Sequence, residues 1–197
     1  MPVNAGRRFS QAISEGDGIS LIARVTAADD AARVEEQGAE AVLVAVLDDG
    51  ALAQIRTATS LPVLLAWPRD QGRPPHEADA CLLDVGEDLG SLAELSGEFS
   101  EICELAFRID DEEHLEAALE QLDPEIFVLS APGADGEEAL EHVLDLLPDV
   151  PAGKLAIAEL SAASADDVGA LERAGFDGVI VEPRSVVDLV GDAPPDV

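Results

Sequence analysis

Short apolar runs alternate with segments of helical periodicity along most of the chain. The apolar runs have the length of strands buried on both faces. They cover residues 19–25, 41–46, 62–67, 80–85, 103–109, 126–130, 155–159 and 178–181. Between most of them, apolar residues recur three and four positions apart, which predicts amphipathic helices. These predicted helices cover residues 28–37, 51–58, 89–99, 112–122, 137–147 and 165–174.

Two of these segments share a more specific signature. Residues 32–44 and 169–181 each read as a charged helix closed by glycine, a two-residue turn and an apolar strand. Gly38 and Gly175 stand where a helix ends in the left-handed conformation, which glycine tolerates best. This signature is typical of a βα repeat whose strands form a parallel sheet.

Eight strands alternating with helices predict an α/β fold, a compact (β/α)8 TIM barrel. We expect one domain over residues 1–197, with a short extra helix and lead-in at 1–18 and a frayed tail at 192–197. The third crossover, residues 68–77, contains three prolines and leaves little room for a full helix. Asp111 and Ser164 are the expected N-caps of the helices that follow them.

Charge changes the picture of what the surface can bind. The chain has 42 acidic and 11 basic residues, a formal net charge of −31 over 197 residues. Such a surface repels nucleic acid and anionic membranes. Because 47% of the residues are hydrophobic, a large core is nevertheless available. We interpret the charge as adaptation to concentrated salt, which screens it; an acidic interaction surface is the alternative.

The sequence carries no pattern for export or membrane insertion. No apolar run reaches the ~18 residues of a membrane span, and the basic start lacks a following apolar stretch, so we expect a cytoplasmic protein. Cys81 and Cys103 lie in apolar runs, and two cysteines at this spacing predict free buried thiols rather than a disulfide framework or a zinc site. We expect no metal and no cofactor.

Three segments resemble one known family. They are the opening Arg-Phe-Ser-Gln-Ala-Ile at 8–13, the strand Ile-Ser-Leu-Ile-Ala-Arg-Val at 19–25, and Leu-Pro-Val-Leu at 61–64. Together they resemble indole-3-glycerol phosphate synthase, the barrel of tryptophan biosynthesis. Residues 108–115 and 158–161 are similar to its fifth and seventh strands. The resemblance implies a TIM barrel and, where the family's residues are kept, a carbon–carbon lyase.

Most of the family's catalytic positions are substituted. By the resemblance, the glutamate and lysine of strand one fall on Arg24 and Thr26, the lysine after Leu-Pro-Val-Leu falls on Ala66, and the glutamate of strand five falls on Arg108. Only the strand-seven glutamate is kept, as Glu159. Ring closure needs a positioned acid and base, each contributing about 10²–10⁴-fold. The sequence therefore predicts loss of indoleglycerol phosphate synthase activity.

The substitutions leave two hypotheses for the barrel mouth. In the first, which we favour, Arg24 and Arg108 pair with Glu159 and aspartates and fill a retired active site, in a binding or interaction protein whose partner the sequence does not identify. In the second, the arginines clamp a small anionic metabolite, phosphorylated or carboxylated, and Glu159 is the catalytic acid or base of a lyase or isomerase.

Phosphate binding depends on the segments after strands seven and eight. Barrels of this type bind phosphate there through backbone amides that glycine leaves accessible. In this chain Pro183 replaces one such amide, and an acidic residue precedes it. Ser161, Arg184 and Ser185 still provide hydroxyls and a cation, and we expect them to be the ligand-binding residues if phosphate binds.

Overall fold

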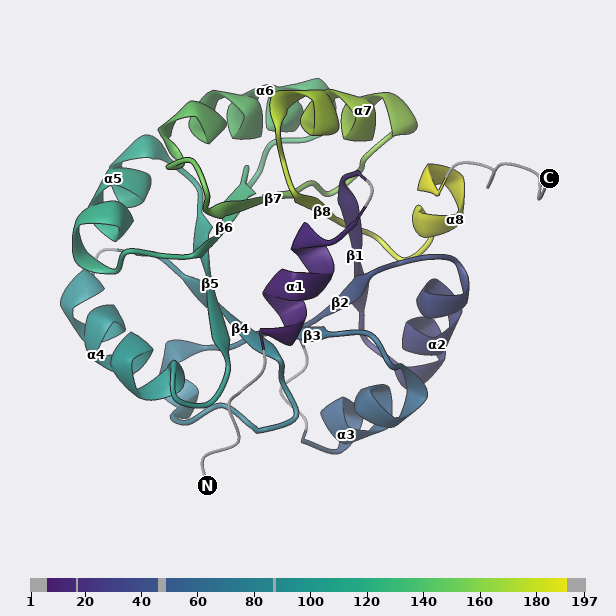
Figure 1. The fold of residues 1–197 in the computed structure, drawn as a ribbon, viewed down its shortest axis with the longest axis horizontal. Coiled ribbons are helices and arrows are strands. Elements are labelled where there is room, and N and C mark those ends of the chain that lie inside the picture. Colours follow the sequence, from purple (N-terminus) through teal and green to yellow (C-terminus); the bar gives the residue numbers. More distant parts are fainter. Residues whose placement is uncertain (1–6, 17, 46–48, 87, 191–197) are drawn as a thin grey trace.

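The central feature of the molecule is a closed barrel of eight parallel strands (Figure 1). The computed structural model describes residues 7–16, 18–45, 49–86 and 88–190. Each strand pairs with its neighbour in sequence, and β1 pairs with β8 to close the ring. The strands are β1 (Ser20–Val25), β2 (Ala41–Val44), β3 (Val63–Ala66), β4 (Ala80–Asp84), β5 (Glu104–Ile109), β6 (Ile126–Ser130), β7 (Leu155–Glu159) and β8 (Gly178–Val181). The predicted (β/α)8 TIM barrel is confirmed.

A ring of helices surrounds the strands (Figure 1). They are α2 (Ala28–Glu36), α3 (Asp49–Ala58), α4 (Leu89–Phe99), α5 (Glu112–Gln121), α6 (Gly136–Leu146), α7 (Ala165–Ala174) and the short α8 (Val186–Leu189). The proline-rich third crossover forms only a 3-10 turn, η1 (Arg69–Gln71), and a second such turn, η2 (Leu147–Asp149), follows α6. The sequence analysis did not predict α8. The predicted frayed tail and the end of predicted strand 41–46 lie outside the described residues.

Local signals set several helix ends as the sequence predicts. The Asp111 side chain accepts a hydrogen bond from the His114 amide at the start of α5. Ser164 and Asp167 form a reciprocal capping box at the start of α7. The helix α7 ends at Gly175, whose φ of 106° is the left-handed conformation.

Side chains alternate between the two faces of the barrel wall. Outward-facing residues pack beneath the helices in the larger core. Inward-facing residues form a second core inside the barrel, which includes Ile22, Leu43, Leu64, Leu82, Ala106, Val128, Ile157 and Ile180. The barrel is therefore filled by its own side chains, as the layered interior of this fold requires.

The additional helix α1 (Arg8–Ser14) lies across the amino end of the barrel (Figure 1). Its Phe9 and Ile13 are 0% and 2% exposed and belong to the interior core. Glu104, the first residue of β5, accepts hydrogen bonds from the Phe9 amide at 2.8 Å and the Ser10 amide at 3.2 Å. A carboxylate at the first turn satisfies free amides and complements the helix dipole. The helix thus closes this end.

Removing the Phe9 ring tests how far the fold depends on this closure. We expect Phe9→Ala to lower the free energy of unfolding by about 3–5 kcal/mol, because it leaves a void in a close-packed interior. The exposed Gln11→Ala on the same helix is the matched control and should change stability by no more than about 0.5 kcal/mol. Denaturant unfolding in concentrated KCl measures both. If both variants lowered the free energy of unfolding by the same small amount, α1 would not stabilise the barrel.

Candidate functional site

A charged layer lies directly above the apolar interior, at the carboxyl ends of the strands. Because side chains alternate along a strand, the residue two positions after an interior residue faces the same side. For five strands the residue at that position is charged; four of these residues lie on the strand, and the fifth directly follows it. The residues are Arg24 on β1, Asp84 on β4, Arg108 on β5, Glu159 on β7 and Glu182 after β8.

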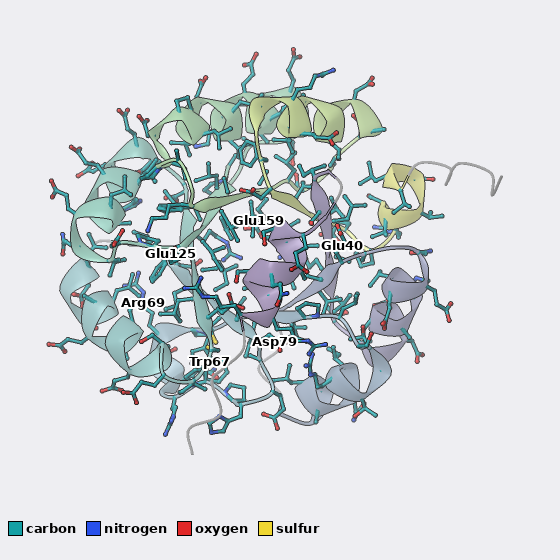
Figure 2. All side chains as sticks on the ribbon, viewed as in Figure 1. Glu40, Trp67, Arg69, Asp79, Glu125 and Glu159 are labelled. Atoms are coloured by element: carbon teal, nitrogen blue, oxygen red, sulfur yellow. The ribbon has the colours of Figure 1, made fainter. Side chains whose placement is uncertain are left out.

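Glu159 is the centre of this layer, and its position within the ring of strands is labelled in Figure 2. Its Oε2 accepts a hydrogen bond from Arg108 Nε at 2.6 Å, and its Oε1 forms an ion pair with Arg24 Nη2. The Glu159 side chain is only 11% exposed. One nearly buried carboxylate is therefore neutralised by two guanidinium groups.

Each arginine has a second, more exposed acidic partner. Arg108 Nη1 lies 2.6 Å from Asp84 Oδ1, and Arg24 Nε lies 3.3 Å from Glu182 Oε1. The five side chains form one chain of ion pairs across the mouth, which we call the mouth network. Burial works to lower the pKa of Arg108, but the charges of Glu159 and Asp84 outweigh it and raise that pKa. Three carboxylates face two cations, so the network as a whole is anionic.

Most hydrogen-bonding nitrogen atoms at the mouth already have acidic partners within the protein. The Nε, Nη1 and Nη2 atoms of Arg108 all donate to Glu159 or Asp84. Three of the five N–H groups of Arg108 are used in these bonds, and a ligand anion that approached the remaining ones would meet the charges of the neighbouring carboxylates. By contrast, a groove of about 840 Å³ lies at the opposite end of the barrel, along α1, α4 and the starts of β5 and β6.

Two of the three phosphate candidates, Ser161 and Ser185, have hydrogen-bond partners within the protein. Ser161 Oγ donates to Asp135 Oδ1 at 2.7 Å, so this hydroxyl lies beside a carboxylate. Ser185 precedes the four-residue α8, and its amide donates to the Glu182 carbonyl at 3.0 Å. Arg184 is exposed. Among the described residues, no hydrogen bond or ion pair joins any of the three to another.

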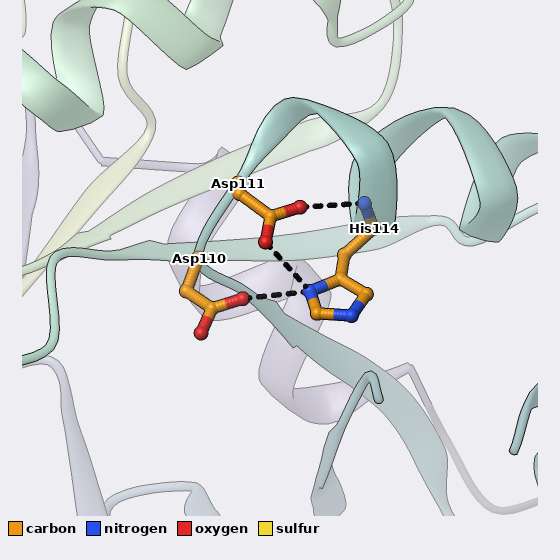
Figure 3. Close-up of side chains that lie close together, drawn as sticks. All are labelled: Asp110, Asp111 and His114. Atoms are coloured by element: carbon orange, nitrogen blue, oxygen red, sulfur yellow. Dashed lines mark hydrogen bonds and ion pairs between the residues drawn. The ribbon is translucent and has the colours of Figure 1, made fainter. Parts of the chain in front are cut away.

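A further polar cluster escaped the sequence analysis. His114 Nδ1 lies 2.9 Å from Asp110 Oδ1 and 3.1 Å from Asp111 Oδ2 at the start of α5 (Figure 3). The signal was present as Asp-Asp-x-x-His, because residues three and four apart share a helix side. The expectation of no metal did not take account of these three residues, whose ligand atoms lie within 4.8 Å of one another. Imidazole and carboxylate are ligands that Zn²⁺ accepts.

The contacts within this cluster favour the protonated form of the His114 imidazole. The hydrogen bond with Asp110 raises the pKa of His114; burial opposes this, and the charge of Asp111 adds to it. Asp111 also uses its Oδ1 to accept the His114 amide at 2.7 Å. The cluster therefore works as an ion-paired cap on α5. The nearby His142 Nε2 lies 2.7 Å from the Asp110 carbonyl oxygen, which connects α6 to the same turn.

Comparison with known proteins adds no assignment to this geometry. No model of a known protein family matches the chain, and a search of curated proteins finds no similar sequence. Within the described residues, no helix is long and apolar enough to cross a membrane.

The His114 cap predicts a pH dependence of stability. Because the folded-state pKa lies above the ordinary value of about 6.5, the stabilisation is complete below that pH and is lost as the pH rises through the folded-state pKa. We expect the stability difference between the native protein and His114→Gln to be larger at low pH than at high pH. Asp110→Asn should lower the pKa of His114 in an NMR titration. An imidazole that titrates at or below its ordinary value in the native protein would contradict this account.

Proposed function

We propose that this chain is a divergent relative of indole-3-glycerol phosphate synthase that has lost catalysis and acts as a binding or interaction protein. One observation carries the proposal: the two arginines at the mouth bind Glu159, the single family carboxylate that the chain retains, between them. A catalytic acid or base has to reach the reacting atoms of a substrate. Both oxygens of Glu159 are instead occupied by guanidinium groups.

The neighbouring positions support loss of the family reaction. Ala66 ends β3 where the family resemblance expects a lysine, and Thr26 is exposed just after β1. Neither side chain supplies an ammonium that protonates a carbonyl. We expect no turnover of indoleglycerol phosphate precursor above the buffer blank in concentrated KCl, measured by absorbance.

One observation favours a second candidate, an enzyme acting on a small phosphorylated or carboxylated metabolite. Arg24 and Arg108 remain 31% and 25% exposed, and their outer partners Glu182 and Asp84 are 42% and 72% exposed. An anion that replaced these outer carboxylates would meet both guanidinium groups, with Glu159 behind them. Bidentate binding of carboxylate or phosphate by arginine is strong enough to compete for such a site.

A variant of Arg108 separates the two candidates. If the network is structural, Arg108→Ala should lower the free energy of unfolding by about 1–3 kcal/mol, because a hydrogen-bonded ionic partner of Glu159 is lost. Arg184 is exposed, and Arg184→Ala is the matched control. Its free energy of unfolding should stay within about 0.5 kcal/mol of that of the native protein. Phosphosugars and dicarboxylates should leave the melting temperature of the native protein unchanged. A ligand-dependent rise that Arg108→Ala abolishes would overturn the structural role and favour the enzyme.

The acidic surface supports a proposal about the protein's solvent. Figure 2 shows oxygen-tipped side chains projecting outward from the ring of helices. We take this surface to be adapted to concentrated salt, since at 1 M the screening length falls to about 3 Å. The melting temperature should rise steadily from dilute buffer to molar KCl. A melting temperature independent of salt would favour an acidic interaction surface instead.

A further inference from the structure

The two cysteines are in direct contact although 22 positions separate them in sequence. Cys81 lies on β4, and Cys103 immediately precedes β5. Ala80 is in register with Glu104, so the parallel pairing of the two strands brings the thiols together. Their Sγ atoms lie 3.2 Å apart, and both thiols are free and buried. A disulfide needs a sulfur–sulfur distance of about 2.05 Å, which is a short movement from this contact.

The backbone holds Cys103 in place from two sides. Its amide donates to the Phe99 carbonyl at the end of α4 at 3.1 Å, and the following Glu104 amide donates to the Asp79 carbonyl at 3.1 Å. Both cysteines belong to the outer core between the barrel wall and the helices. The contact between the thiols is therefore fixed by the barrel ladder and by α4 together.

The two cysteines differ in their relation to the groove. Cys103, which is 3% exposed, is among the residues that line the 840 Å³ groove beside α1 and α4, whereas Cys81 is 0% exposed and is not among them. The hydrogen bond with Cys81 lowers the pKa of Cys103; burial and the nearby Glu104 and Asp79 carboxylates oppose this. The same contact raises the pKa of Cys81. Cys103, which lines the groove, is thus the cysteine whose pKa this contact lowers.

We propose that Cys81 and Cys103 are an oxidative modification site, in which a hydroperoxide that enters the groove converts the two thiols into an intramolecular disulfide. In the first step, the Cys103 thiolate attacks the terminal oxygen of the hydroperoxide; the S–O bond forms, the O–O bond breaks, and the leaving oxyanion takes a proton to become an alcohol or, from hydrogen peroxide, water. In the second, the Cys81 sulfur attacks the sulfenic sulfur; the S–S bond forms, the S–O bond breaks, and the hydroxyl leaves with the Cys81 proton as water. One hydroperoxide is reduced and two thiols are oxidised.

The bond would link β4 to the start of β5 and enclose the crossover that contains α4. A crosslink that closes a loop of this size restricts the unfolded chain and stabilises the native fold. The oxidised protein should therefore melt at a higher temperature than the reduced protein. A thiol reductant should reverse the shift.

Peptide mapping of the native protein tests the site without any variant. After treatment with hydrogen peroxide in concentrated KCl and alkylation of remaining thiols, we expect the peptides of Cys81 and Cys103 to be joined within one chain, with the loss of two hydrogen atoms. Protein unfolded before peroxide treatment is the control for intrinsic thiol reactivity. A native protein that stays reduced, forms disulfides between chains or accumulates sulfinic acid on unjoined cysteines would overturn the proposal.

Single variants assign the order of attack. Cys81→Ser should trap a sulfenic acid on Cys103 that reacts with dimedone, because the resolving thiol is gone. Cys103→Ser should leave Cys81 unmodified under the same treatment, since the groove does not reach it. Dimedone labelling of Cys81 in the native protein, ahead of Cys103, would contradict the assigned order.

Discussion

The mouth of this barrel depends on the need to neutralise one nearly buried carboxylate. Glu159 is held inside the ring of strands, where an unpaired charge would cost several kcal/mol. Arg24 and Arg108 approach it from β1 and β5 and satisfy both of its oxygens. Because each guanidinium has donors left over, Asp84 and Glu182 complete the network at its exposed ends.

The mouth network covers the carboxyl end of the barrel, and α1 covers the amino end. Below the mouth network lies an apolar interior, and beneath that interior Phe9 and Ile13 of α1 fill the amino end. In this fold the carboxyl ends of the strands usually carry the chemistry, and the amino ends carry stability. Here the carboxyl-end positions are occupied by ion pairs among the protein's own side chains. Fold alone assigns no activity, so the state of these ion pairs decides between a binding protein and an enzyme.

The features that could be predicted from the sequence are those set by local chemistry or strand periodicity. Gly175, Asp111 and Ser164 end or begin helices through their own backbone or side-chain preferences, and each was predicted. The approach of Arg24 and Arg108 to Glu159 was expected from the family resemblance, which placed all three residues at the barrel mouth. Strand ends were less certain: β4 stops at Asp84, where the apolar pattern continued to Val85.

What the sequence analysis missed depends on register or on side-chain rotation. Glu182 meets Arg24 because β8 closes on β1, a pairing between the two ends of the chain. Cys81 and Cys103 look unrelated at a spacing of 22 until parallel pairing aligns β4 with β5. The His114 side chain likewise adopts a conformation that contacts both Asp110 and Asp111, which the spacing of these residues allows but does not determine.

A crystal structure of the native protein grown from concentrated sulfate tests the closed mouth most directly. Sulfate has the charge and shape of a phosphate ligand and would be present in large excess. The account predicts that Arg24 and Arg108 stay on Glu159 and that no sulfate lies between them. A sulfate bound by both guanidinium groups, with Asp84 and Glu182 turned away, would contradict it and show a working anion site.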